Sequence, residues 1–138
     1  MRKMADIIRS QNPLVLGSTT TIQEAARQMR ERDVGAALVV NDDRRLIGIF
    51  TGRDAVCRVL AEGKDAAKVT LVEVMTAAPN TMPSTHQAIE ALRLMQDAHF
   101  RHLPIVDNGR VVGIVSRGDF RGEEIDRPDE ENGLWERL

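Results

Sequence analysis

The sequence contains an internal duplication, and this feature constrains the fold more than any other. Residues 24–56 align with residues 90–120: five identical residues recur 66 positions later, and three more recur at an offset of 65 after one residue is dropped in a turn. A period near 66 is too long for a solenoid unit and too short for two independent domains, so we expect both copies to share one core. The identical pairs are Glu24/Glu90, Ala25/Ala91, Arg27/Arg93, Met29/Met95, Val40/Val106, Gly48/Gly113, Ile49/Ile114 and Asp54/Asp119.

The sequence of each copy predicts a short helical turn, an amphipathic helix, a hairpin and a second helix, in that order. In the first copy Thr21 is expected to cap the amphipathic helix, with the Glu24 side chain reaching back to the cap. The short helical turn that opens the second copy is expected to be capped by Thr70. The hairpin strands are apolar almost throughout, which favours burial on both faces. The predicted segments are turns at 5–10 and 70–75, hairpin strands at 36–40, 46–50, 103–106 and 111–115, and second helices at 52–63 and 117–125.

The composition is that of one compact soluble domain. The 138 residues are 42% hydrophobic and 29% charged, with a net charge of −2. Cys57 is the single cysteine, so an intrachain disulfide is impossible and a cytoplasmic location is expected. We predict no membrane span and no signal peptide, because no apolar run exceeds five residues. The balanced charge and the few aromatic residues argue against nucleic-acid binding.

The two most informative motifs follow the last strand of each hairpin. In each motif a strand ends at a hydroxyl residue, and an Asp follows three positions later at the start of a helix. One interpretation is a helix cap, in which hydroxyl and carboxylate serve only the backbone. The other is a ligand site, because a fixed carboxylate can accept hydrogen bonds from the two vicinal hydroxyls of a ribose, and the neighbouring arginine can face a phosphate. The motif residues are Thr51, Arg53 and Asp54 in the first copy and Ser116, Arg117 and Asp119 in the second.

The repeated pattern, with each hairpin ending in Gly-h-h-[Ser/Thr]-x-x-Asp (h, hydrophobic), resembles a pair of CBS (cystathionine beta-synthase) domains, a Bateman-type regulatory module. The resemblance covers residues 6–123 and implies an α+β fold of two tandem β-α-β-β-α repeats packed with pseudo-twofold symmetry. It also implies two clefts for adenosine nucleotides and assembly as a homodimer. We assign residues 6–64 to the first repeat, 71–123 to the second, and 124–138 to an acidic C-terminal tail.

The resemblance also implies roles for particular residues. Asp54 and Asp119 match the ribose-binding aspartates of the family, and Thr51 and Ser116 match its hydroxyl position beside ribose and phosphate. A dipeptide before the second hairpin, Arg101-His102, matches a position where the family often places basic residues against phosphate.

The first copy departs from this pattern, because Gly35 and Ala36 replace the basic dipeptide and offer no cation. We therefore expect the two clefts to bind unequally. We expect the charge of His102 to depend on pH around its ordinary pKa of about 6.5. An adenine slot would be lined from strand ends by Val39, Ile49, Ile105 and Ile114.

These expectations predict a nucleotide-sensing regulatory protein, not an enzyme. Its ligand would be AMP, ATP or NAD, and binding would shift the relative packing of the copies and so change binding to an unidentified protein partner. Two alternatives are a ligand-free dimerisation scaffold, in which the motifs only cap helices, and a nucleotide-processing enzyme. Titration with the three nucleotides separates the scaffold from the sensor.

Three lesser features receive structural interpretations. We predict no metal site, because His99 and His102 would share a helix face only if the helix continued past Ala98. The lone Cys57 is expected to pack in the core. In the acidic tail, we hypothesise that Trp135 docks across a dimer interface.

Overall fold

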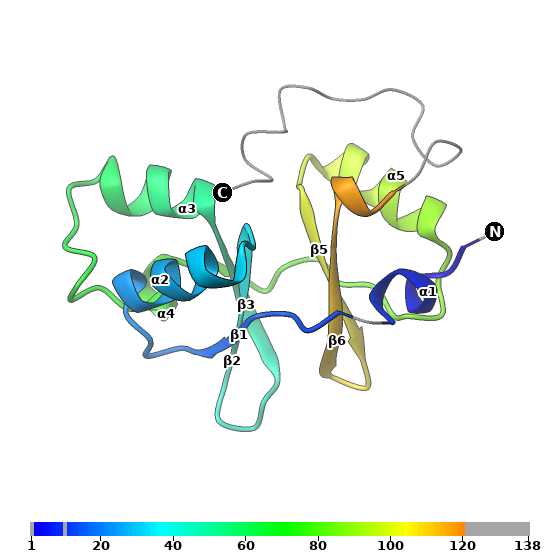
Figure 1. Ribbon diagram of the computed structural model, residues 1–138, viewed down its shortest axis with the longest axis horizontal. Helices are drawn as coiled ribbons and strands as arrows, with labels where there is room; N and C mark the ends of the chain where they lie inside the picture. Colours follow the sequence, from blue (N-terminus) through cyan, green and yellow to red (C-terminus); the bar gives the residue numbers. More distant parts are fainter. Residues whose placement is uncertain (1, 10, 121–138) are drawn as a thin grey trace. The chain divides into compact units, whose positions relative to one another are not determined.

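Two compact units make up residues 2–9 and 11–120, the part of the chain that the computed structural model describes (Figure 1). The first-copy unit contains residues 14–79, and the second-copy unit contains residues 2–9, 11–13 and 80–120. Each unit buries its own apolar cluster, and one core shared by both copies stays a prediction. The predicted α+β class is confirmed. The acidic tail and the hypothesis for Trp135 lie outside the described residues.

The first-copy unit is built on a four-stranded sheet in the order β1-β2-β3-β4, with β1 parallel to β2 and the other pairs antiparallel. Strand β2 is almost wholly buried, as its apolar sequence predicts. Helix α3 continues directly into the π-helix η1. The elements are β1 (Val15–Gly17), α2 (Ile22–Arg32), β2 (Ala36–Val40), β3 (Leu46–Thr51), α3 (Gly52–Asp54), η1 (Ala55–Leu60), α4 (Leu71–Val74) and β4 (Thr76–Ala77).

The second-copy unit is built on the β5–β6 hairpin, which closes through Asn108 and Gly109 with φ values of 53° and 80°. Positive φ at both positions is what the Asn-Gly sequence predicts. A single parallel bridge between Met82 and Ile105 stands where the first-copy unit has strand β1. The elements are α1 (Met4–Ile8), α5 (Ala88–Ala98), β5 (His102–Asp107), β6 (Arg110–Ser116) and the 3₁₀ turn η2 (Arg117–Asp119).

The short opening helices are exchanged between the repeats. Helix α1 opens the first repeat in sequence but belongs to the second-copy unit, where Lys3 forms a bridge with Gln87. Helix α4 opens the second repeat but belongs to the first-copy unit, where Thr70 forms the equivalent bridge with Thr21. A spatial unit is therefore not a sequence repeat, and Lys3 and Thr70 occupy equivalent positions 67 residues apart.

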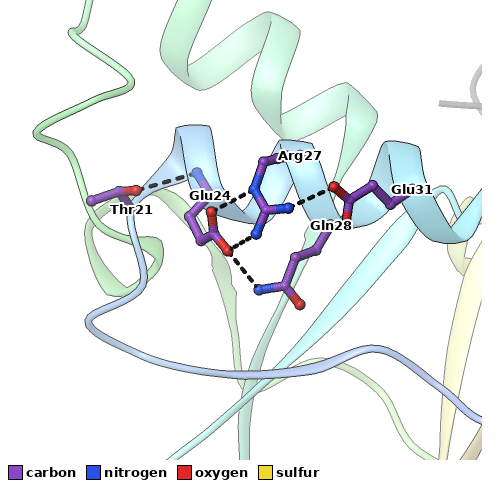
Figure 2. Close-up of polar contacts among 5 residues, drawn as sticks. All are labelled: Thr21, Glu24, Arg27, Gln28 and Glu31. Atoms are coloured by element: carbon purple, nitrogen blue, oxygen red, sulfur yellow. Dashed lines mark hydrogen bonds and ion pairs between the residues drawn. The ribbon is translucent and has the colours of Figure 1, made fainter.

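Helix α2 forms one of the two side-chain interactions of its predicted cap (Figure 2). The Thr21 hydroxyl accepts a hydrogen bond from the Glu24 amide at 3.2 Å. The Glu24 carboxylate does not reach back to the cap; it binds Arg27 and Gln28, and Arg27 also bridges to Glu31 at 2.6 Å. The hydrogen bond from Arg27 is the main reason that the pKa of Glu24 falls to about 2. A charge-assisted bond to a guanidinium is stronger than one to a backbone amide, so the predicted second half of the cap is lost.

Two further expectations are corrected. Cys57 is exposed, because Val59 is the residue of η1 that faces the core and Cys57 lies roughly half a turn away. Strand β6 is not buried on both faces: Val112 is 37% exposed, and in the second half of the strand the buried Gly113 and Val115 alternate with half-buried residues. Within the described residues the second helix of the second copy is only η2, followed by the buried Phe120.

Two equivalent glycines allow the opening helices to pack on the hairpins, and they predict different responses to alanine. A Cβ on Gly113 would lie 2.5 Å from Cγ2 and 2.6 Å from Cβ of Ile8, a branched side chain fixed to α1. A Cβ on Gly48 would meet the flexible end of Met75, with Sδ at 2.3 Å. We expect Gly113→Ala to lower the free energy of unfolding by about 1–3 kcal/mol and Gly48→Ala by clearly less, measured by urea denaturation. Equal losses in the two variants would contradict this packing.

Candidate functional site

The second copy brings its predicted site residues together at one end of the β5–β6 hairpin. His102 and Ser116 are direct partners across the strand pair. Arg101 immediately precedes β5, and Arg117 and Asp119 lie in η2, which immediately follows β6. A hydroxyl, a carboxylate, an imidazole and two guanidinium groups therefore belong to adjacent backbone segments within one unit.

The Asp119 carboxylate in this cluster is only partly used by the protein. Its Oδ2 accepts hydrogen bonds from the Ser116 amide at 2.7 Å and from the Ser116 hydroxyl at 3.4 Å. Its Oδ1 has no hydrogen-bond partner among residues 2–9 and 11–120. Asp119 is also only half-buried. The carboxylate is thus held in place through one oxygen while the other remains able to accept bonds from a ligand.

The equivalent carboxylate of the first copy is fully engaged. Asp54 is 8% exposed, and its Oδ2 accepts from the Thr51 amide at 3.0 Å and the Thr51 hydroxyl at 3.2 Å. Its Oδ1 accepts from the Thr76 hydroxyl at 3.4 Å and lies 3.5 Å from Nε of Arg58. Arg58 is itself fixed by a 3.0 Å hydrogen bond to the Met75 carbonyl. This arrangement matches the helix-cap interpretation, and the two additional donors, Thr76 and Arg58, occupy the remaining carboxylate oxygen. The neighbouring Arg53 is exposed.

The exchange of opening helices explains why Asp119 lacks the same donors. Thr76 follows α4, and the equivalent position after α1 is Arg9, which is 78% exposed and paired with Asp6. The position equivalent to Arg58 is Glu123, which lies outside the described residues. Asp54 and Arg58 are four residues apart on one helix, so that pair was detectable from the sequence, whereas Thr76 carried no local signal.

The basic dipeptide distinguishes the two copies as expected, but His102 does not titrate as predicted. Burial, followed by the charge of Arg101, lowers the pKa of His102 to about 4, so the imidazole is neutral at pH 7. It offers one donor and one acceptor instead of a positive charge. In the first copy Gly35 is buried and its carbonyl accepts from the Gly52 amide, while Ala36 is the partner of Thr51 across the sheet.

A third arginine, which the sequence did not indicate, reaches the second-copy motif. Nη2 of Arg2 donates to the backbone carbonyl of Asp119 at 3.0 Å, although the two residues are 117 positions apart. Arg2 precedes α1, the exchanged helix, and its side chain is half-buried. Because no local pattern predicts which unit receives α1, no sequence signal could have identified this contact.

The apolar residues suggested for an adenine slot fall into two groups. Val39 and Ile105 are fully buried members of the two core clusters, so the expectation that they line a ligand is wrong. Ile49 and Ile114 belong to neither cluster, and Ile114 is half-buried with its amide bonded to Gln11 at 3.0 Å.

The described residues give no support to a metal site or to a membrane-spanning helix. No cluster of three or more His, Cys, Asp or Glu side chains suited to a metal occurs in residues 2–9 and 11–120. Helix α5 ends before His99, which has the left-handed φ of 58°, so His99 and His102 do not share a helix. Among the helices described, none is long and apolar enough to cross a membrane.

Comparisons with known proteins agree with this architecture. The CBS domain family matches residues 4–60 and 71–125. The Arabidopsis thaliana CBS domain-containing protein CBSCBSPB1 is 36% identical over 108 residues, which are 78% of this chain and 20% of that protein. The chain thus spans about a fifth of the length of this curated relative.

Two solved structures are similar over most of the fold. A CBS-domain protein from Burkholderia ambifaria MC40-6, provisionally named for signal transduction, has a TM-score of 0.77 and 28% identity, covering 85% of this chain and 89% of that one. The CBS domain protein PAE2072 from Pyrobaculum aerophilum, complexed with AMP, has a TM-score of 0.78 and 26% identity, covering 85% and 88%. With two family matches, two equivalent hairpin units and two Gly-h-h-[Ser/Thr]-x-x-Asp motifs, the chain belongs to the CBS domain family and carries a tandem pair of these domains.

Proposed function

We propose that the second copy binds an adenosine nucleotide and that this binding makes the protein a regulatory sensor. The observation that carries the proposal is the open Oδ1 of Asp119, while the equivalent oxygen of Asp54 is occupied. Arg101 and Arg117 lie on the backbone segments adjacent to this carboxylate. The AMP complex of the similar Pyrobaculum protein supports the choice of ligand class.

Each residue has a distinct role in this proposal. Asp119 accepts hydrogen bonds from the ribose hydroxyls, and Ser116 holds the carboxylate in position through its amide. Arg101 and Arg117 bind phosphate, for which guanidinium geometry is well suited. His102, neutral at pH 7, donates a hydrogen bond without adding charge. The ligand biases the equilibrium between conformations, and a protein partner responds to that bias; no bond in the nucleotide is broken.

The first copy has a different role in this proposal. Thr51 and Asp54 cap the helix formed by α3 and η1, and Thr76 and Arg58 complete the cap. A ribose would have to displace these donors from a carboxylate that is 8% exposed. We therefore propose one nucleotide per chain, with the first copy acting as the scaffold in a homodimeric protein.

Isothermal titration with AMP, ADP, ATP and NAD tests the proposal, after copurifying nucleotides have been identified by mass spectrometry and removed. We expect saturable binding of at least one of them at one site per chain. Asp119→Asn weakens this binding by about tenfold or more, because the ribose loses charge-assisted hydrogen bonds. Asp97→Asn is the matched control, since Asp97 is an exposed carboxylate of the same unit.

Two results would count against the proposal. A wild-type protein that binds none of the four nucleotides leaves only the scaffold function. Equal losses of affinity in Asp119→Asn and Asp97→Asn would mean that the carboxylate acts through general charge and not as a ribose contact.

A further inference from the structure

Within the described residues, the second-copy motif lacks the helical continuation that fixes the backbone of the first-copy motif. Asp54 is followed by Ala55 in α-helical geometry, and the helix runs on through η1 to Leu60. Asp119 is the last residue of η2, and the next residue, Phe120, is already extended, with φ of −90° and ψ of 151°. A carbonyl at the end of a helix receives no amide from a following turn and needs another donor. The backbone carbonyl of Asp119 is such a group.

Arg2 supplies this donor. Its Nη2 donates to the Asp119 carbonyl at 3.0 Å, and the half-buried Arg2 is fixed at its own backbone, where its carbonyl accepts from the Ala88 amide at 2.8 Å. In the first-copy unit the Ile22 amide donates in the same way to the Val69 carbonyl at 2.9 Å, but the Val69 side chain packs against the apolar core. The arginine therefore lies in the unit whose motif ends after one turn, and the valine lies in the unit whose helix continues.

The segment that carries this arginine, residues 2–8, is itself docked on the residues just before α5, and we call it the opening segment. The Met4 amide donates to the His86 carbonyl at 2.8 Å. The Ala5 amide donates to the Ser84 carbonyl at 3.0 Å. Met4 is also completely buried in the core of this unit. The arginine at the beginning of the opening segment thus joins a docked segment to η2, over a sequence separation of 117 residues.

The position of the η2 backbone decides where the open carboxylate oxygen lies. The Asp119 carboxylate is held through Oδ2 by Ser116, and Oδ1 is the oxygen that the proposed function assigns to the ribose. The carbonyl and the carboxylate of Asp119 move together, because both are attached to the same Cα. A site whose acceptor is held in advance binds its ligand more tightly, since the ligand does not have to order it. A donor that fixes the Asp119 carbonyl therefore raises the affinity without touching the ligand.

We infer that Arg2 is a positioning residue for the Asp119 site and that, through Arg2, nucleotide binding and the docking of the opening segment stabilise each other. The inference rests on the proposed function and adds the element of the chain that responds to the ligand. The reciprocity follows from linkage, because a contact that raises the affinity for a ligand is strengthened by that ligand by the same factor.

Titration of the full chain with AMP, ADP and ATP gives the first test. Arg2→Met removes the donor but keeps an unbranched side chain. Under conditions where the variant is folded, we expect it to weaken every nucleotide that binds by the same factor of about five to ten. Arg2→Lys restores a charged donor and should recover part of the affinity. Arg9→Met is the matched control, because Arg9 directly follows the opening segment and its hydrogen bond goes to Asp6.

Amide hydrogen exchange gives the second test, with a readout that a merely structural role would not change. In wild type a saturating nucleotide should slow exchange of the Met4 and Ala5 amides by about the factor that Arg2→Met costs in affinity, and in Arg2→Met this protection should vanish. The chain contains its own control, because the Leu71 and Val72 amides of α4 make the equivalent hydrogen bonds in the first-copy unit, at 2.9 and 3.0 Å. The nucleotide should leave their exchange unchanged.

The outcomes separate this inference from the function on which it rests. If wild type binds none of the nucleotides, the proposed function fails. The positioning of η2 is still measurable then, because the Phe120 amide donates to the Arg117 carbonyl at 3.3 Å and should exchange faster in ligand-free Arg2→Met than in wild type. If wild type binds but Arg2→Met keeps its affinity, or if the nucleotide protects the opening segment no more than its counterpart in α4, the inference is overturned. A loss of affinity confined to ATP would overturn it as well, because it would mean a direct contact with the additional phosphates.

Discussion

Replacing Asp54 by alanine is expected to lower the free energy of unfolding by about 3 kcal/mol, while the same change at Asp119 should cost less than about 1 kcal/mol. Removing the carboxylate of Asp54, which is 8% exposed, leaves the Thr51 amide and the Thr51 and Thr76 hydroxyls without this acceptor. Arg58 loses its ion-pair partner and keeps its hydrogen bond to the Met75 carbonyl. Within residues 2–9 and 11–120 the Asp119 carboxylate accepts hydrogen bonds only from Ser116, and Asp119 is half-buried, so water can replace the carboxylate. Urea denaturation of both variants measures the difference.

The assignment of the two aspartates depends on the opposite effects of the two substitutions. Asp119→Ala should lose nucleotide binding and keep its stability. Asp54→Ala should lose stability, but under conditions where it is still folded it should bind the nucleotide with unchanged affinity. Amide hydrogen exchange would locate the loss, because strand β3 should open more often in Asp54→Ala. Equal destabilisation by both substitutions would mean that Asp119 is as fully used by the protein as Asp54, and the case for a site in the second copy alone would fail.

The elements of this fold are predictable because their signals are local. Apolar periodicity identified α2 and α5, and the Asn108-Gly109 turn identified the β5–β6 hairpin. No local signal in the sequence predicts which of the two units each opening helix packs in. Helices α1 and α4 are short apolar turns whose sequences do not specify a partner, and the exchange is visible only in the bridges that Lys3 and Thr70 make.

The candidate site likewise contains residues that a local pattern predicts and residues that no local pattern predicts. Thr51/Asp54 and Ser116/Asp119 were identified from their three-residue spacing, and both pairs form the predicted hydrogen bonds. The sequence could not say which carboxylate has an oxygen left for a ligand, because that depends on residues brought by the exchanged segments. Thr76 arrives beside Asp54 and Arg2 beside Asp119, each over a long sequence separation.

His102 makes the stability of the second-copy unit depend on pH. Its pKa is about 4 in the folded protein, against 6.5 for an ordinary histidine, mainly because burial disfavours the charged form. The unfolded chain therefore binds a proton between these values when the folded chain does not. Stability is complete above about pH 6.5 and falls as the pH decreases toward 4, by about 3 kcal/mol in total.

The measurement is the urea midpoint of wild type and His102→Gln at a series of pH values from 7.5 to about 4. The variant keeps a neutral hydrogen-bonding side chain, so it should lose this part of the pH dependence even if its stability at neutral pH also changes. Carboxylates titrate in the same range, but they do so in both proteins and cancel in the difference. His99→Gln serves as the control, because His99 is exposed and should leave the wild-type slope intact.

A bound nucleotide should oppose this loss, since a phosphate close to His102 favours its protonated form and raises its pKa. The stabilisation by a saturating nucleotide should therefore grow as the pH falls from 7 to 5, and this growth should vanish in His102→Gln. If the pH dependence of wild type and His102→Gln were the same without ligand, the imidazole would not be held neutral by burial. If they differed without ligand but the nucleotide left that difference unchanged, the phosphate would lie away from the β5–β6 hairpin end, and Arg101 and His102 would have to be removed from the proposed site.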